Sequence, residues 1–220
     1  NEAEIYAHLG LQWVPPELRE DSGEIEAAEL GVIPQLMEPS MLKGAFHNHT
    51  TASDGTATLS QMAEAAQNLG WEFLGIADHS QILQIASGLS PDELVTQAAE
   101  VRALNENWAD KGVDFRLFHG NECDILPDGG LDYTDEERSL LDHVVGSVHQ
   151  LPTWMKRDED VNTEALIRAI ENPSLTILGH PTGRILGGRD GFAVDLHAVL
   201  RRMGELNSEG ELKVVEINAS

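Results

Sequence analysis

The sequence of 220 residues predicts an α/β fold built on a parallel sheet. Short apolar runs alternate along the chain with helical patterns, most of the runs are apolar on both faces, and polar side chains follow them at their C-terminal ends. Strands that are apolar on both faces are typical of a parallel sheet covered on both sides. Six strands are expected, at residues 45–48, 73–77, 115–119, 143–148, 175–178 and 212–217.

Residues 1–40 differ in pattern from the rest of the chain. The stretch "EAEIYAHLGL" predicts a short helix, which contains His8. The acidic stretch "QWVPPELREDSGEIEAAELG" that follows contains two prolines, and it predicts an extended linker with a helical turn. The regular alternation of strands and helices begins only at Leu42.

The helices between the strands have clear start and stop signals. One opens at Thr58 and stops at Gly70, and the next has Ser90 at its N-cap followed by a proline. A third, "TEALIRAIENP", ends before a proline. The stretch "VDLHAVL" predicts a helix with Asp195 as N-cap, so Asp195 and His197 point apart and are not expected to share a metal ion.

Composition limits the functions open to the chain. The net charge of −24 disfavours binding of nucleic acid unless a local feature reverses the field. No apolar run is long enough to cross a membrane. The single cysteine, Cys123, excludes an internal disulfide, indicates a reducing compartment, and is expected to be a buried strand residue. We therefore expect a cytoplasmic protein.

Five successive predicted strands each deliver a metal-type ligand at their C-terminal ends, where parallel α/β folds place active sites. Residues 47 and 49 lie on one face of a strand because side chains alternate. With an acidic residue in the turn that follows, the expected ligands are His47, His49, Asp54, His79, Glu122, His149 and His180. This mixed set suits zinc, manganese or iron. Asp78 and Asp124 are expected to orient ligand imidazoles, and His8, His119 and His143 to be structural.

Five motifs, in their order along the chain, carry a resemblance to a known family. "HNHTTASDG", "ADH", "GNECDILPDG", "GSVH" and "GHPTGR" resemble the PHP (polymerase and histidinol phosphatase) domain. The stretch "CDILPDGGLDY", together with the arginine of "GHPTGR" and the N-terminal "EAEIYAHLGLQWVPPELRE", resembles more narrowly the C-terminal PHP domain of bacterial family X DNA polymerases.

The resemblance implies a distorted seven-stranded barrel that holds two to three divalent metal ions through the seven ligands above and an Asp-x-His pair after the seventh strand. No such pair follows "VVEINAS", so we expect a barrel truncated after about six strands and an incomplete site. Residues 1–40 would be the linker and tail of a preceding polymerase-like domain. Residues 41–220 would be the PHP phosphoesterase domain, with its C-terminal end missing.

The function expected from both lines of argument is metal-dependent phosphoester hydrolysis with a bridging hydroxide. Arg184 is the candidate catalytic residue that holds the phosphate. The resemblance implies a 3′–5′ exonuclease or 3′-end-processing module of a DNA repair polymerase, with DNA 3′ ends as substrate and an attached polymerase domain as partner. The alternatives are a phosphomonoesterase of the histidinol phosphatase type, or a non-catalytic module that stabilises the polymerase.

Overall fold

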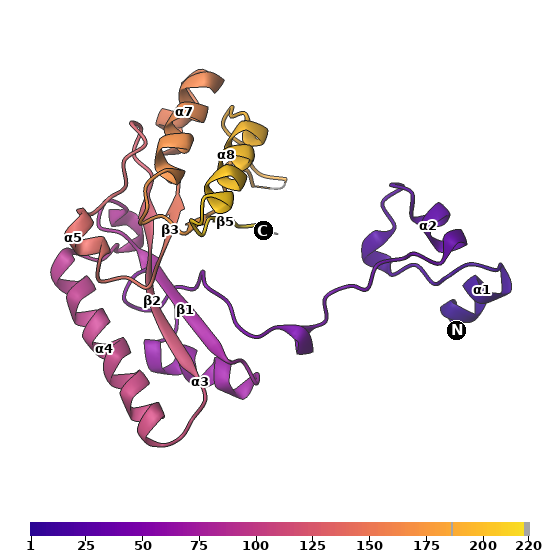
Figure 1. Ribbon diagram of the computed structural model, residues 1–220, viewed down its shortest axis with the longest axis horizontal. Coiled ribbons are helices and arrows are strands. Elements are labelled where there is room, and N and C mark those ends of the chain that lie inside the picture. Colours follow the sequence, from indigo (N-terminus) through magenta and orange to yellow (C-terminus); the bar gives the residue numbers. More distant parts are fainter. Residues whose placement is uncertain (186, 218–220) are drawn as a thin grey trace. The chain divides into compact units, whose positions relative to one another are not determined.

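The computed structural model describes residues 1–185 and 187–217 (Figure 1). The chain divides into two compact units, Asn1–Leu42 and Lys43–Ser220. The sequence prediction placed a domain boundary at residue 40. The helices of the described residues include none with the length and apolar composition that a bilayer requires.

The first unit contains two short α-helices, α1 (Glu2–His8) and α2 (Glu24–Leu30), and two 3₁₀ turns, η1 (Pro16–Leu18) and η2 (Pro39–Met41). Val14 and Ala28 are its buried apolar residues. The Arg19 guanidinium donates to the Val14 carbonyl and pairs with Glu2 at 2.8 Å, which ties α1 to the segment after it.

Within its described residues, the second unit is built on a parallel sheet of five strands in the order β1–β2–β3–β4–β5. Their bounds are Phe73–His79, Arg116–Asp124, His143–Ser147, Ile177–Leu178 and Val214–Val215. The predicted parallel α/β fold is therefore confirmed, but the seven-stranded barrel is not. β1 and β2 run beyond the predicted ends at residues 77 and 119, so His79 and Glu122 lie inside strands and not after them.

The prediction of a strand at residues 45–48 is wrong. The segment lies beside β1, where the Ala45 and Asn48 carbonyls accept from the Gly75 and Ala77 amides, each at 2.7 Å. The two acceptors are three positions apart in the segment, whereas the two donors are two positions apart in β1. The segment thus has one extra residue, as in a β-bulge. The Asn48 side-chain amide, and not a backbone amide, donates to the Gly75 carbonyl. The ladder is broken there, so no regular strand forms.

Helices pack on the sheet through two hydrophobic clusters. Leu59, Ala63 and Ala66 of α3 pack with Leu74 and other side chains of β1, α4 and β2. A larger cluster joins β2, β3 and β4 to α7 and α8, which contact each other (Figure 1). The helices and 3₁₀ turn of this unit are α3 (Leu59–Asn68), η3 (Gln84–Ala86), α4 (Pro91–Asp110), α5 (Asp135–Arg138), α6 (Leu151–Trp154), α7 (Glu159–Ile170) and α8 (Leu196–Ser208).

The predicted helix caps are confirmed. Thr58 and Ser90 each form a capping box at the start of α3 and α4, with Gln61 and Glu93 at the third helical position. Asp195 caps α8 by accepting from the Ala198 amide at 3.0 Å. In each case a short polar side chain satisfies an amide that the first turn of the helix leaves unpaired.

Alternation along β1 and β2 sorts the side chains onto two faces. Leu74 and Ile76 face the helices α3 and α4, and Asp78 continues that face. His79 and Glu122 are on the opposite face, beyond an aromatic group of Phe46, Phe118 and His143. The candidate ligands of β1 and β2 therefore lie near the C-terminal ends of these strands, on the face away from α3 and α4.

Candidate metal centre

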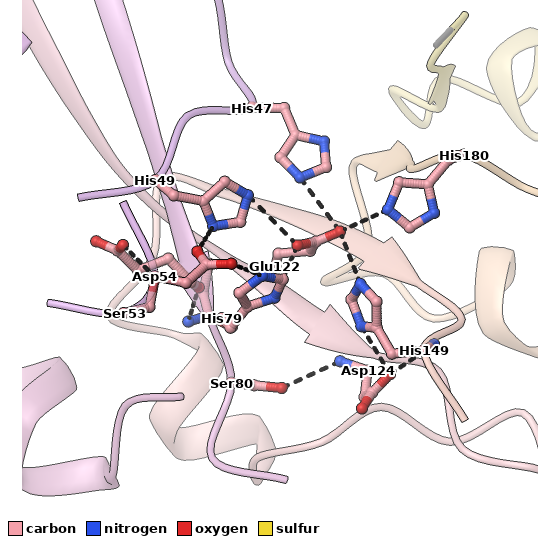
Figure 2. Close-up of polar contacts among 12 residues, drawn as sticks. His47, His49, Ser53, Asp54, His79, Ser80, Glu122, Asp124, His149 and His180 are labelled. Atoms are coloured by element: carbon pink, nitrogen blue, oxygen red, sulfur yellow. Dashed lines mark hydrogen bonds and ion pairs between the residues drawn. The ribbon is translucent and has the colours of Figure 1, made fainter. Parts of the chain in front are cut away.

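The candidate metal centre is a cluster of histidines around the carboxylate of Glu122 (Figure 2). Glu122 is on β2, and its side chain is only 1% exposed. Five imidazoles surround it, each with a ring nitrogen between 2.9 and 3.5 Å from a Glu122 oxygen: His47, His49, His79, His149 and His180. The ends of β1 and β2 supply His79 and Glu122, and the segments after β3 and β4 supply His149 and His180. The structure thus gathers six of the seven expected ligands at one point.

The seventh expected ligand, Asp54, lies at the edge of this group. Its carboxylate oxygens are 3.4 Å from both His49 Nδ1 and His79 Nε2. The turn that brings it back is closed by a hydrogen bond of 2.8 Å from the Gly55 amide to the Thr50 carbonyl. A Cβ atom at Gly55 would lie 2.4 Å from the His49 carbonyl oxygen, so the turn requires glycine there.

Asp78 does not orient a ligand imidazole, contrary to the sequence prediction. It is fully buried on the other face of β1, because successive side chains of a strand point to opposite faces. It accepts hydrogen bonds of 2.6–2.7 Å from the Thr50 amide and hydroxyl, the Ser53 hydroxyl and the Gln97 amide. Asp78 therefore anchors to β1 and α4 the turn that leads from His49 to Asp54.

Two further carboxylates contact imidazoles at the ring nitrogen that faces away from Glu122. Asp124 lies 3.0 Å from His149 Nδ1 and also accepts from the His149 amide, so its predicted orienting contact is present. Glu216 lies 3.0 Å from His47 Nδ1 and accepts from the His180 amide at 2.8 Å. The sequence prediction missed Glu216, although it follows β5 directly. The expected strand ran to residue 217, so Glu216 lay inside it, and the rule of a polar side chain at the strand end did not single it out.

The ring nitrogens of this group fit a metal centre. His47 and His149 each have both ring nitrogens facing carboxylate oxygens, yet a neutral imidazole carries only one N–H. One contact per ring therefore sets two lone pairs against each other, unless the ring is protonated or a cation lies between them. Nδ1 of His49 and of His79 is buried without a hydrogen-bond partner, although the latter lies 2.9 Å from Glu122. Metal ions would satisfy all of these nitrogens.

The ligand atoms form three overlapping groups, each with its atoms within 4.8 Å of one another. The groups are His47, His49 and Glu122; His49, Asp54 and His79; and His79, Glu122 and His149. Overlap through shared residues is the arrangement expected of a centre for more than one ion. Imidazole and carboxylate together suit zinc, manganese or iron.

The electrostatics of the metal-free group are dominated by Glu122. Burial by itself would raise the pKa of Glu122, but hydrogen bonds from the surrounding histidines hold it far below its ordinary range. Burial would likewise lower the pKa of His47 and His149, but the carboxylates beside each ring raise both to about 9. The carboxylates of Asp54 and Glu122 lie farther from the ring of His49, at 3.4 and 3.5 Å, and there burial prevails and lowers the pKa.

Arg184 lies in the wall of a pocket that His149 and His180 also line, and it is exposed there. His119 and His143, which belong to the same unit as the centre, make structural contacts outside it, as expected. His119 bonds to Gln97 and faces the Leu140 carbonyl, and His143 faces the Phe46 carbonyl at 3.0 Å. Cys123 is a fully buried strand residue, also as expected.

Comparisons with known proteins show what this chain is similar to. A family model for the PHP domain matches residues 45–220. The "DNA polymerase/3'-5' exonuclease PolX" of Bacillus subtilis is 38% identical over 212 residues, which are 96% of this chain and 36% of that protein. A protein of Acetivibrio thermocellus named "Probable phosphatase" is 30% identical over 174 residues, which are 78% of this chain and 63% of that protein.

A solved structure, that of a candidate histidinol phosphatase from Listeria monocytogenes, matches with a TM-score of 0.49 and 13% identity. The match covers 78% of this chain and 81% of that one. The chain spans about a third of the length of the Bacillus protein and less than two thirds of the Acetivibrio one.

Proposed function

The chain belongs to the PHP domain family, and from this premise we propose that its second unit is a metal-dependent phosphoesterase. The observation that carries the proposal is the buried Glu122 carboxylate with five imidazole nitrogens within 3.5 Å of it. A buried carboxylate ringed by imidazoles, with Nδ1 of two of the rings left without a hydrogen-bond partner, is costly for a structural core. It suits a site that binds divalent cations.

Each residue of the centre has a role in this proposal. The seven predicted ligands would hold the ions, with Glu122 shared between them because it belongs to two of the three groups. When bound, divalent ions would neutralise charge on the phosphate oxygens and lower the pKa of a water nucleophile. Asp124 holds the His149 ring through Nδ1, which directs Nε2 toward the centre, and Glu216 does the same for His47. Arg184 would bind a phosphate oxygen from the pocket side.

The finer proposal is that the substrate is a DNA 3′ end and the reaction is 3′–5′ exonucleolytic or other 3′-end processing. Its support is the similarity to the Bacillus protein over nearly the whole of this chain, including the first unit. An attached polymerase domain would be the partner. The positive charge of bound ions would reverse the field locally, so the net charge of −24 does not oppose binding of a phosphate group at the centre.

A metal-supplemented assay on an oligonucleotide with a 3′ label tests the proposal. We expect release of the labelled terminal nucleotide with manganese or zinc, and none after treatment with EDTA. The control is Glu122→Gln, which removes the central charge and should abolish release. If no label is released with either metal, the exonuclease proposal is wrong.

A second set of substrates separates the alternatives. Turnover of histidinol phosphate in preference to a 3′-phosphorylated DNA end would identify a small-molecule phosphomonoesterase. Failure to hydrolyse any of these substrates, with metal bound, would favour a non-catalytic module that stabilises an attached polymerase.

A further inference from the structure

A cavity of about 360 Å³ adjoins the metal centre. His149 and His180 line it, so a substrate whose phosphorus lies at the centre would extend into it. The rest of the wall is of two kinds: apolar side chains, among them Leu83 and Leu151, and the arginines Arg184 and Arg189. The cavity is thus a candidate for the part of the substrate that departs on hydrolysis.

The charge of this wall is opposite to that of the protein. The chain carries 38 acidic residues against 14 basic ones, yet the described residues that line this cavity include two arginines and neither Asp nor Glu. A wall of this kind attracts an anion. It repels a cationic leaving group such as histidinol, which carries an ammonium group.

Arg189 is held in the wall by the backbone. Its Nε and Nη2 donate to the Gly183 carbonyl at 3.2 and 2.9 Å, and its backbone pairs with that of Ile185. Gly183 has a φ of 60° in this turn, and a Cβ atom there would lie 2.5 Å from the Leu151 side chain. The two contacts occupy two of the five N–H donors of a guanidinium. The remaining donors belong to a group whose position is already set, which reduces the entropy lost on binding an anion.

We propose that this cavity is the leaving-group subsite and that Arg189 selects a leaving group that carries a phosphate of its own. The inference rests on the proposed phosphoesterase function and narrows its substrate class to nucleic acid. Hydrolysis adds water across the P–O3′ bond: the water oxygen ends on phosphorus, and the 3′-oxygen departs as a hydroxyl after taking up a proton. The apolar wall would contact the sugar and base of the departing nucleotide, and Arg189 its 5′-phosphate.

Two dinucleotides test the subsite. Thymidylyl-thymidine has a neutral leaving group, and its 5′-phosphorylated form has the same scissile bond with an anionic one. With manganese, we expect kcat/KM to be about tenfold higher for the phosphorylated form, which corresponds to about 1.4 kcal/mol. The ratio should fall as salt is added, because Arg189 is exposed. Arg189→Gln should bring the ratio close to one, and Arg189→Lys should retain part of the preference.

Arg168→Gln is the matched control. Arg168 is also exposed and also donates through Nε to a backbone carbonyl, that of Asp128, but it does not line the cavity. Its substitution should leave the ratio unchanged. Far-ultraviolet circular dichroism and metal content of each variant would show whether the fold and the centre are retained.

The possible results distinguish failure of the proposed subsite from failure of the proposed phosphoesterase function. If wild-type protein cleaves both dinucleotides at equal rates, or cleaves the labelled oligonucleotide but neither dinucleotide, the subsite is wrong and the phosphoesterase function stands. If Arg189→Gln lowers both rates equally, Arg189 acts only by closing the turn at Gly183, and the subsite is again wrong. If no substrate is cleaved with any metal, the proposed function itself fails.

Discussion

Replacement of Asp78 by asparagine would test how the ligand-bearing turn is held. Asp78 is fully buried and accepts two hydrogen bonds on each carboxylate oxygen. Asparagine keeps the shape but turns one oxygen into an NH₂ donor. If that donor replaces Oδ2, it faces the NH₂ group of Gln97 and the Thr50 hydroxyl. The Gln97 amide can accept only by flipping, which reverses its hydrogen bond with His119.

The expected loss of stability follows from these contacts. One to two hydrogen bonds to a buried charged acceptor are lost, at about 1.5–3 kcal/mol each, so the free energy of unfolding should fall by about 1.5–6 kcal/mol. In a unit of this size each kcal/mol lowers Tm by about 2–4 °C, which gives a decrease of roughly 3–24 °C. The turn that carries Asp54 would also lose its anchor, and metal affinity should fall by about 10- to 100-fold.

The assay has two parts. Thermal unfolding of the EDTA-treated protein measures the stability term without metal, and competition with a chromophoric chelator measures metal affinity. Asp132→Asn is the control, because Asp132 is nearly buried and accepts from the Ile82 and Tyr133 amides away from the centre. It should lower Tm and leave metal affinity unchanged. Wild-type metal affinity in Asp78→Asn would refute the anchoring role.

Three further substitutions or conditions give separate tests. His149→Ala should remove metal without unfolding the core, and unchanged occupancy by mass spectrometry would contradict its assignment as a ligand. Glu216→Gln should weaken metal binding by about tenfold or more, because the His47 ring loses its charged partner, and a chelator titration measures this. The EDTA-treated protein should be most stable near pH 6.5. His47 and His149, with pKa values raised to about 9, stabilise it fully below their ordinary value of 6.5 and lose this effect as the pH rises toward 9. Burial lowers the pKa of His119, so stability also falls with the pH below 6.5, and urea unfolding across this range would show both limbs.

Local features of the fold could be predicted well. The caps at Thr58, Ser90 and Asp195 depend on a side chain and an amide three residues away, and all three form as expected. The same local argument separated Asp195 and His197 from the metal ligands. The ends of the strands were predicted less accurately. β2 continues to Asp124 because β1 and β3 continue beside it, and the sequence of a single strand does not show how far its partners extend.

Helical periodicity over residues 58–70 predicts one apolar face with Met62, Ala66 and Leu69, and the structure confirms this only in part. Ala66 is buried, but Leu69, expected on the same face, is 68% exposed, while Leu59 and Ala63 are buried instead. Periodicity places residues on one side of a helix. Which part of that side meets the sheet depends on where the helix crosses it, and that is decided by the packing of β1 and α4 against α3.

The sequence by itself determined the residue types of the site, and with them its chemistry, because the candidate ligands come at or soon after the ends of its apolar runs. Strand periodicity and residue type are properties of short segments, and they sufficed to single out seven candidate ligands before any contact was known. Only the tertiary structure decided that the histidines converge on Glu122, that Asp78 anchors a turn instead of an imidazole, and that Glu216 supports His47. Each of these joins residues far apart in the chain, because register and strand order, and not local pattern, determine which strand ends meet.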